Sequence, residues 1–331
     1  MGLTENEMEY LSRTLDKCDA ALTGKPTLES IYDPAWRSQF RQRTLAANCL
    51  ADVAYPSAYA VHVLEMFYPV DYQQRLEEGA RLLLVRLPVS ERNHLVERMR
   101  GAGCQSAEEE LLLARGFALE FGDAAVLPPP GDSSRPRPEF VVQATGVEID
   151  IEAKGLLDSQ EVQQLNDCAR RFGTGGWFTF GQVDTPNRLR AGLARKLLAA
   201  KEGVPRIVVL TQYTPWLTPD VTIPLIRQLA LSPLDFRIPD VKHPLAIGYV
   251  FQRGIQCVWF NQSVQDRHGV SADLRERLRR AVCRSFYPRP DRLFLDETSD
   301  ARLEQDLIAR TASGTEPTAD LQDTEGFQGA G

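Results

Sequence analysis

Residues 138–154 read PEFVVQATGVEIDIEAK, and this stretch decides the fold that we predict. Glu139 to Ala144 and Val147 to Ala153 are two runs rich in β-branched and apolar residues, as strands are. Thr145-Gly146 between them is a short turn sequence. We therefore predict two neighbouring strands that pair across a tight connection.

The second of these strands gathers its charged side chains on one face. Side chains alternate across a strand, so Glu148, Asp150, Glu152 and Lys154 share one face and the apolar residues between them share the other. A solvated acidic surface is one interpretation of this face. A functional site is the other, because the face ends with a carboxylate and an ammonium group that point the same way.

An acidic helix is predicted before the two strands. Ser106 followed by Glu109 is a capping-box pattern, and we expect a helix over Ala107 to Arg115 that stops at Gly116. Phe117 to Phe121 is predicted to be another strand of the same sheet. The segment from Ala124 to Pro138 is rich in Pro, Gly and Ser, which predicts a loop.

Further elements are predicted after the two strands from the spacing of their apolar residues. The expected helices are Gln160 to Phe172, Asn187 to Glu202 and Ala272 to Cys283. The expected strands are Arg206 to Gln212, Leu245 to Gln252 and Ile255 to Phe260, the last two joined at Gly254.

Three regions follow along the chain. Residues 1–103 carry apolar side chains at helical spacing, such as Leu45, Cys49 and Val53, and are predicted to form a helical N-terminal region. Residues 104–295 are predicted to form an α/β domain. Residues 296–331 end in a polar, Gly-rich tail, which buries too little apolar surface to fold, so we expect disorder there.

The composition is that of an ordinary globular protein. The 331 residues are 43% hydrophobic and 25% charged, which allows a sizeable core. An apolar run long enough to span a membrane and a signal peptide are both lacking, so we expect a cytoplasmic chain without a membrane partner. The six cysteines show no zinc spacing. The net charge of −7 does not by itself indicate a nucleic-acid binder, although local charge matters more than the total.

Pro138-Glu139, followed by Glu152-Ala153-Lys154, resembles the signature of the PD-(D/E)XK nuclease superfamily. The resemblance covers residues 105–212, where the predicted helix, three strands, helix and strand follow one another in the order of the family's αβββαβ core. It implies a restriction-endonuclease-like α/β fold with a mixed sheet. The first signature position is Glu139, where the commonest pattern has aspartate.

The resemblance also implies a site. Glu139, Glu152 and the carbonyl of Ala153 would bind Mg²⁺ or Mn²⁺, and Lys154 would position the attacking water or offset charge on the phosphate. Family members often add a glutamate from the first helix. Glu108, Glu109 and Glu110 compete for that role, and Glu109 is our choice because it lies on the side of Leu112 and Leu113, which should face the sheet.

Nucleic acid, with DNA as the first candidate, is the partner that the resemblance implies, and a homodimer stays open. Arg195 and Lys196 on the helix 187–202 are candidates for phosphate contact, and a solvated helix face is the alternative. A second basic group could also follow a nucleic-acid backbone or pair with acidic neighbours. It consists of Arg275, Arg277, Arg279, Arg280 and Arg284.

Three functions remain in competition at this point. The first is a metal-dependent nuclease that serves defence or repair. The second is a catalytically silent protein on the same fold that acts as a binding or assembly module. The third is a helical interaction protein in which the motif occurs by chance. Metal binding separates the first from the third, and turnover separates the first from the second.

Overall fold

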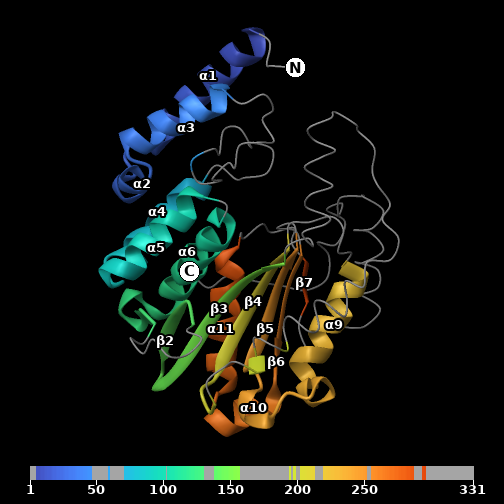
Figure 1. Cartoon of the computed structure of the whole chain (residues 1–331). Coiled ribbons are helices and arrows are strands. Elements are labelled where there is room, and N and C mark those ends of the chain that lie inside the picture. The colour runs from blue at the N-terminus through green and yellow to red at the C-terminus, as the bar shows by residue number, and fades with distance from the viewer. Residues whose placement is uncertain are drawn as a thin grey trace, which may run out of the picture.

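The computed structural model describes residues 5–46, 59, 71–101, 103–129, 138–156, 194, 197–198, 202–212, 219–251, 255–286 and 293–295. It belongs to the α/β class, with a mixed sheet and helices that precede it in the chain (Figure 1). The described strands form one sheet in the order β1-β2-β3-β4-β5-β6-β7. They are β1 (Val126–Leu127), β2 (Phe140–Ala144), β3 (Val147–Leu156), β4 (Arg206–Gln212), β5 (Ala246–Phe251), β6 (Ile255–Phe260) and β7 (Leu293–Leu295).

Helices make up most of the remaining described chain. Those before the sheet are α1 (Glu5–Leu22), α2 (Pro26–Ile31), α3 (Pro34–Ala46), α4 (Tyr72–Leu84), α5 (Val89–Arg100) and α6 (Cys104–Phe121). Those between and after the strands are α9 (Pro219–Leu231), α10 (Gln262–His268) and α11 (Ala272–Ser285), with short 3₁₀ turns at Asp123–Ala125, Pro233–Phe236 and Asp240–Lys242. The prediction that the N-terminal region is helical is therefore confirmed for its described residues.

The predicted hairpin is present. Strands β2 and β3 are antiparallel, with Ala144 opposite Val147, so Thr145-Gly146 is a two-residue turn. Both turn residues have positive φ, 47° at Thr145 and 85° at Gly146, as the turns that match the twist of a hairpin require. This turn fixes the register and thereby places Asp150 and Glu152 on one face of β3.

The middle of the sheet is parallel. Strand β4 lies parallel to β3, with Arg206 beside Asp150, and β5 lies parallel to β4. Strand β6 returns antiparallel to β5, and β7 is parallel to β6. The predictions for 206–212, 245–252 and 255–260 are confirmed, within a residue or two at each end, for the residues that the structure describes.

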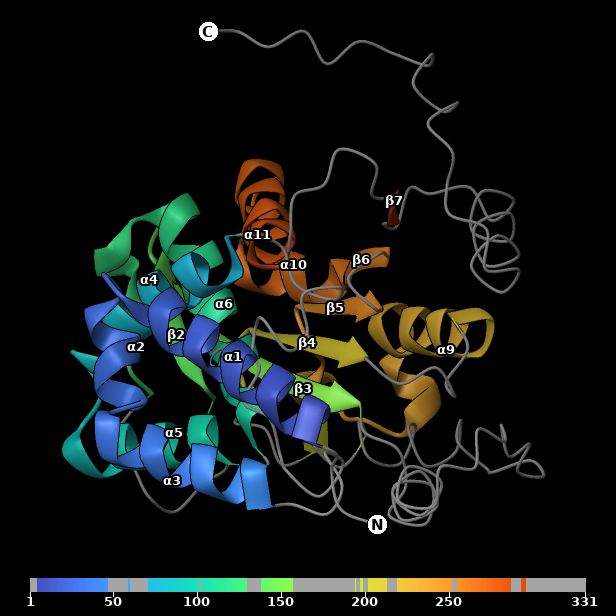
Figure 2. The ribbon, with the colours of Figure 1, turned by 90° about the horizontal axis from the view of Figure 1, so that it is seen from above.

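Helices cover both faces of the sheet. Alternate residues of β4 point into two cores: Ile207 and Val209 face the core that α6 and α11 share, and Val208 and Leu210 face the core around α9. In Figure 2, strands β3 to β6 run between α6 and α11 on one side and α9 on the other. The architecture is therefore a three-layer α/β arrangement.

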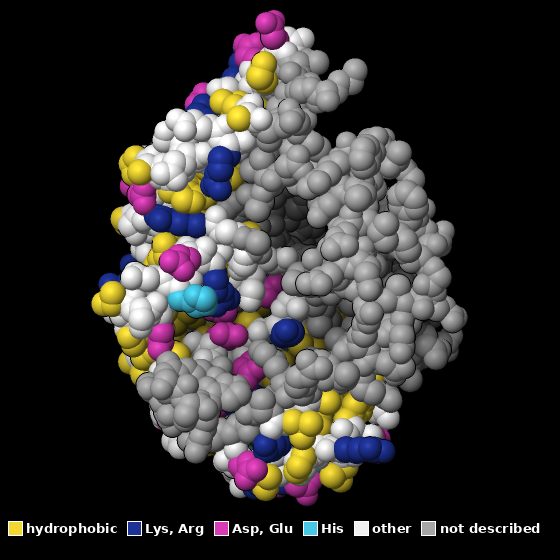
Figure 3. Space-filling view, in the orientation of Figure 1, with side chains coloured by type: hydrophobic (Ala, Val, Ile, Leu, Met, Phe, Trp, Pro, Cys, Tyr) yellow, Lys and Arg dark blue, Asp and Glu magenta, His cyan; other side chains and the backbone are white. Residues whose placement is uncertain are grey.

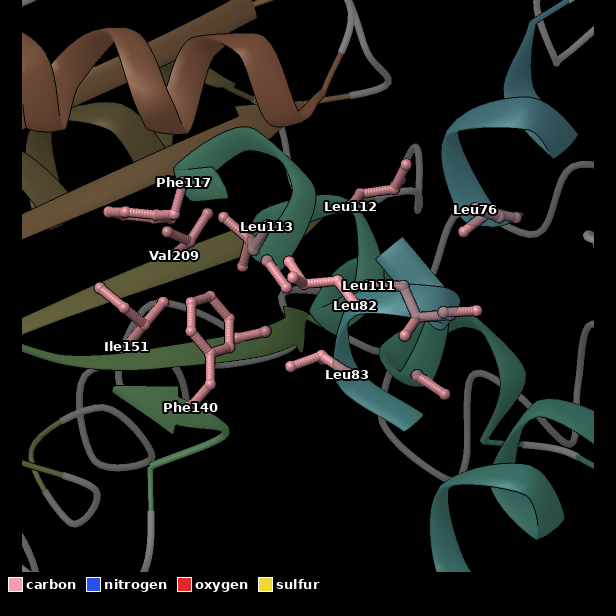
Figure 4. Packing of buried hydrophobic residues seen from close by; sticks show 14 of the residues in the cluster. Leu76, Leu82, Leu83, Leu111, Leu112, Leu113, Phe117, Phe140, Ile151 and Val209 are labelled. Atoms are coloured by element: carbon pink, nitrogen blue, oxygen red, sulfur yellow. The ribbon is translucent and has the colours of Figure 1, made fainter. Parts of the chain in front are cut away.

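Helix α6 joins the sheet to the N-terminal helices. Figure 4 shows Phe117 of α6 beside Val209, near Phe140 and Ile151 of the sheet, while Leu111 lies among side chains of α4. The hydrophobic cluster is continuous from α1 through α4 and α6 into the sheet. Helix α6 is thus buried on several sides, which explains its long apolar run.

Three predictions about this helix are wrong. Phe117 to Phe121 is not a strand, because α6 continues through Gly116 to Phe121. Gly116 does not end the helix but allows α11 to pack against it, since a Cβ there would lie 2.9 Å from the backbone nitrogen of Ser285. Ser106 does not cap the helix either. The helix starts at Cys104, and Ser106 Oγ accepts a hydrogen bond from Arg98.

The first strand of the sheet lies where a loop was predicted. Val126–Leu127 pairs with Val141 and Val142 of β2, within the segment 124–138. Helices α9 and α10 were not predicted at all. The helix 160–172, the connection at Gly254, the tail 296–331 and most of the helix 187–202 lie outside the described residues, although Ala194, Leu197 and Leu198 are helical.

Candidate active site

The signature residues gather where β3 approaches its carboxyl end. Glu139 immediately precedes β2, is half-buried, and donates its backbone N–H to the carbonyl of Ile151 over 2.9 Å. This bond places Glu139 beside the Ile151–Glu152 segment of β3. Ala153 follows in the buried core, and Lys154 is exposed. The hairpin therefore brings both acidic signature positions to one part of the sheet.

The three consecutive glutamates of α6 are all buried, and their surroundings differ. Glu108 accepts a hydrogen bond from the hydroxyl of Tyr72, and Glu110 forms an ion pair with Arg98. Oε2 of Glu109 lies 3.9 Å from the position that a Cβ on Gly155 would take. Glu109 is therefore the carboxylate that lies close to Gly155, near the end of β3.

Arg98 of α5 links the N-terminal helices to this acidic group. Its Nη1 donates to Oε2 of Glu110 over 3.2 Å, and its Nη2 donates to Ser106. Burial disfavours the charged form of Arg98, but the hydrogen bond with Glu110 and the charges of Glu110, Glu139 and Glu109 outweigh it and raise the pKa of Arg98. The guanidinium therefore offsets part of the repulsion among these carboxylates.

A second arginine, Arg206, is the first residue of β4 and binds Glu152, a role that the sequence did not predict. Nη1 of Arg206 lies 2.8 Å from Oε1 of Glu152, and Nη2 lies 2.9 Å from Oδ2 of Asp150. The three side chains are 3%, 4% and 6% exposed for Arg206, Glu152 and Asp150, so this is a buried ion cluster. The cluster follows from the parallel register of β3 and β4, which sets Arg206 beside Asp150 and which the sequence does not contain.

The donor set suits a hard cation. Glu139 and Glu152 supply carboxylate oxygens and Ala153 a carbonyl, and Mg²⁺ is commonly bound through one or two carboxylates while it keeps several waters. Arg206 already occupies one oxygen of Glu152. Within the part of the chain that the structure describes, no three His, Cys, Asp or Glu side chains gather closely enough to hold a metal ion. These residues would therefore offer a cation two carboxylates and a carbonyl, with water as the remaining ligands.

The basic candidates divide into two groups. Arg195 and Lys196 lie outside the described residues. In α11, Arg277, Arg280 and Arg284 converge on Glu120, the penultimate residue of α6. Eleven residues separate Glu120 from Glu109 on the same helix, or about 16 Å at the α-helical rise. These arginines therefore join α11 to the far end of α6 and do not frame the acidic site.

The surface around the site carries both signs of charge. On the face shown in Figure 3, acidic and basic side chains lie next to one another over the middle of the described surface. Such mixing differs from the basic stripe typical of a nucleic-acid groove. The described face therefore offers no broad basic footprint.

Comparison with known proteins gives no relative: no protein-family model, curated protein or solved structure matches the chain. None of the described helices combines the length and hydropathy that crossing a bilayer requires.

Proposed function

We propose that this chain is a metal-dependent nuclease with a restriction-endonuclease-like core, acting on nucleic acid and first of all on DNA. The order of α6, strands β1 to β3 and the parallel strand β4 supports the fold, because it follows the order that the sequence resemblance implies. The observation that carries the proposal is the placement of Glu139 beside the Ile151–Glu152 segment of β3 by a backbone hydrogen bond, with Glu109 of α6 close to Gly155 of the same strand.

In this mechanism Glu139, Glu152 and the Ala153 carbonyl would hold Mg²⁺ or Mn²⁺, and Glu109 is the carboxylate that α6 would add. The bound ion would lower the pKa of a water molecule and offset charge on the scissile phosphate. Lys154, which is exposed at the end of β3, places its ammonium where a phosphate oxygen can reach it. Defence or repair in the cytoplasm is the role that such an activity would serve.

One observation favours a second function, a catalytically silent binding or assembly module on the same fold. Glu152 and Asp150 are two carboxylates on one face of a strand, and such pairs repel one another unless a cation lies between them. Arg206 is that cation, and it satisfies the pair without any metal. The acidic face can therefore exist for structural reasons alone.

Cleavage of single- and double-stranded DNA and RNA with Mg²⁺ or Mn²⁺ tests the proposal. The informative variant is Lys154→Ala, because Lys154 is exposed and its removal leaves the core intact. The matched control is Lys17→Ala, an exposed lysine on α1. Metal-dependent cleavage that Lys154→Ala abolishes and Lys17→Ala retains supports a nuclease. Absence of cleavage from all four substrates, or equal activity of both variants, supports the silent module.

Glu152→Gln is a poorer test of catalysis. The change would weaken the bond to Arg206 inside the protein, and breaking one partner of a buried ion cluster destabilises a fold by about 3–5 kcal/mol. Loss of activity in that variant would therefore not distinguish chemistry from misfolding.

The proposed nucleic-acid contact has its own test. Replacement of Arg195 and Lys196 together by Ala removes two cations, and each phosphate contact contributes about 0.9 to the slope of log affinity against log salt on duplex DNA. A slope that falls by about 1.8 in magnitude supports phosphate contact by this pair. An unchanged slope removes Arg195 and Lys196 from the interface.

A further inference from the structure

The cluster formed by Asp150, Glu152 and Arg206 is anchored at both of its strands. Asp150 donates its backbone N–H to Pro205 over 3.0 Å, and Arg206 accepts at its carbonyl a bond of 2.8 Å from Leu245. Arg206 and Asp150 are also neighbours in the parallel register. The guanidinium therefore has a fixed position between the two carboxylates.

The two terminal nitrogens of the Arg206 guanidinium bond to different carboxylates. Nη2 bonds to Asp150 and Nη1 bonds to Glu152, so one cation serves two acids. Counted alone, two carboxylates and one guanidinium carry a net charge of −1. Glu152 is also a carboxylate that the proposed nuclease would use to bind its metal. The same side chain would then bind both the Arg206 guanidinium and the divalent cation.

We propose that Arg206 is an internal counter-ion that competes with a divalent cation for Glu152 and so sets the metal affinity of the candidate site. The inference rests on the proposed function for the identity of the metal ligands. Two cations that share one carboxylate repel one another, and the effect is strong where water is largely excluded. Metal binding must therefore loosen the Arg206–Glu152 bond or proceed against the charge of Arg206.

Three variants of the full-length chain test this competition, with Mn²⁺ alone as the probe and no nucleic acid present. Asp150→Asn/Arg206→Met removes one charge of each sign, so the net charge of the cluster stays at −1 while Glu152 loses its ion pair with Arg206. Arg206→Met alone also removes this ion pair but leaves both carboxylates. Asp150→Asn alone leaves Arg206 with Glu152 as its one remaining acid in this cluster.

The readouts are the Mn²⁺ dissociation constant from titration calorimetry and the rise of the melting temperature that saturating Mn²⁺ produces. We expect the double variant to bind Mn²⁺ about tenfold more tightly than the wild type, which corresponds to about 1.4 kcal/mol. Asp150→Asn should bind more weakly than the wild type. Arg206→Met should have a lower melting temperature without metal and a larger rise with Mn²⁺.

The charge-matched double variant keeps the test valid if Arg206→Met fails to fold. It lacks the repulsion between the buried carboxylates of Asp150 and Glu152, and its cluster has the same net charge as that of the wild type. Mn²⁺ affinity equal to that of the wild type, or weaker, in the double variant overturns the competition and shows that Arg206 positions or merely stabilises the strand. Failure of the proposed function has a different signature. It would appear as no cleavage of any substrate while the order of Mn²⁺ affinities among the variants still holds.

Discussion

Gly79 of α4 lies directly against the backbone of Leu111 in α6. A Cβ on Gly79 would be 2.7 Å from the carbonyl carbon of Leu111 and nearer still to its oxygen. The two helices can approach this closely only because position 79 has no side chain. Glu109 and Glu110 lie within a turn of this contact, so the packing of α4 on α6 also determines where the acidic side chains of α6 stand.

Gly79→Ala should destabilise the protein. Alanine gains about 1 kcal/mol in helix propensity, but the clash is with backbone that cannot rotate away, and overpacking typically costs about 1–3 kcal/mol. We expect a net loss measured by chemical denaturation. Gly103→Ala is the control, because the nearest atom to its Cβ would be Cγ of Arg98 at an ordinary 3.4 Å. An equal effect at both positions would refute the role of the close approach.

Arg98 and Glu110 should be energetically coupled. Their ion pair is partly buried, and its loss removes a cation that also interacts with the charges of Glu139 and Glu109. We expect Arg98→Gln to cost about 2 kcal/mol of unfolding free energy. A double-mutant cycle with Glu110→Gln should give a coupling energy of at least about 1 kcal/mol. Arg81→Gln, at an exposed position on α4, is the matched control and should be close to neutral.

Glu120 should make the stability depend on pH. Partial burial would raise its pKa, but the hydrogen bond from Arg280 and the charges of Arg280, Arg284 and Arg277 outweigh burial and hold the pKa of Glu120 below its ordinary value. The stabilisation is then fully present above the unfolded pKa of about 4.3 and is lost as the pH falls through the lower folded pKa.

The measurement for Glu120 is the unfolding free energy of the wild type and of Glu120→Gln from pH 7 to pH 3. We expect a difference of about 1 kcal/mol at pH 7, because the arginines are partly exposed. The difference should shrink below about pH 4.3. Glu97→Gln, at an exposed position of α5, should show no such trend. A difference that stayed constant with pH would mean that the charge of Glu120 is not the cause.

A substitution in the hairpin turn should raise the unfolding free energy of the protein. Thr145 has a φ of 47°, a conformation that a β-branched residue adopts with strain, and Gly146 has a φ of 85°. Thr145→Asn creates the Asn-Gly sequence that two-residue turns of this kind prefer. We expect a rise of about 0.5 kcal/mol in the unfolding free energy, whereas Gly146→Ala should lower it. Destabilisation by Thr145→Asn in thermal melts would contradict this account of the turn.

Local sequence was sufficient for the centre of the fold. The alternation of Val147 to Ala153 and the turn at Thr145-Gly146 predicted β2 and β3 with the correct partners, and the apolar run after Pro205 predicted β4. These features depend on neighbours in the chain: a period of two residues and a backbone conformation that glycine favours. The acidic face of β3 was predictable for the same reason.

Contacts between distant residues decided the rest. In the sequence, Gly116 resembles a helix end, so Phe117 to Phe121 was predicted as a strand although it is helical. The close packing of α11 explains the glycine instead. Three adjacent glutamates are alike in sequence, and their different neighbours in space, among them Tyr72, Arg98 and Gly155, make them different. Arg206 lies more than 50 residues from Glu152 along the chain, and only the register of β3 and β4 brings its charge to that carboxylate. Electrostatic and packing energies depend on distance in space, which local sequence does not contain.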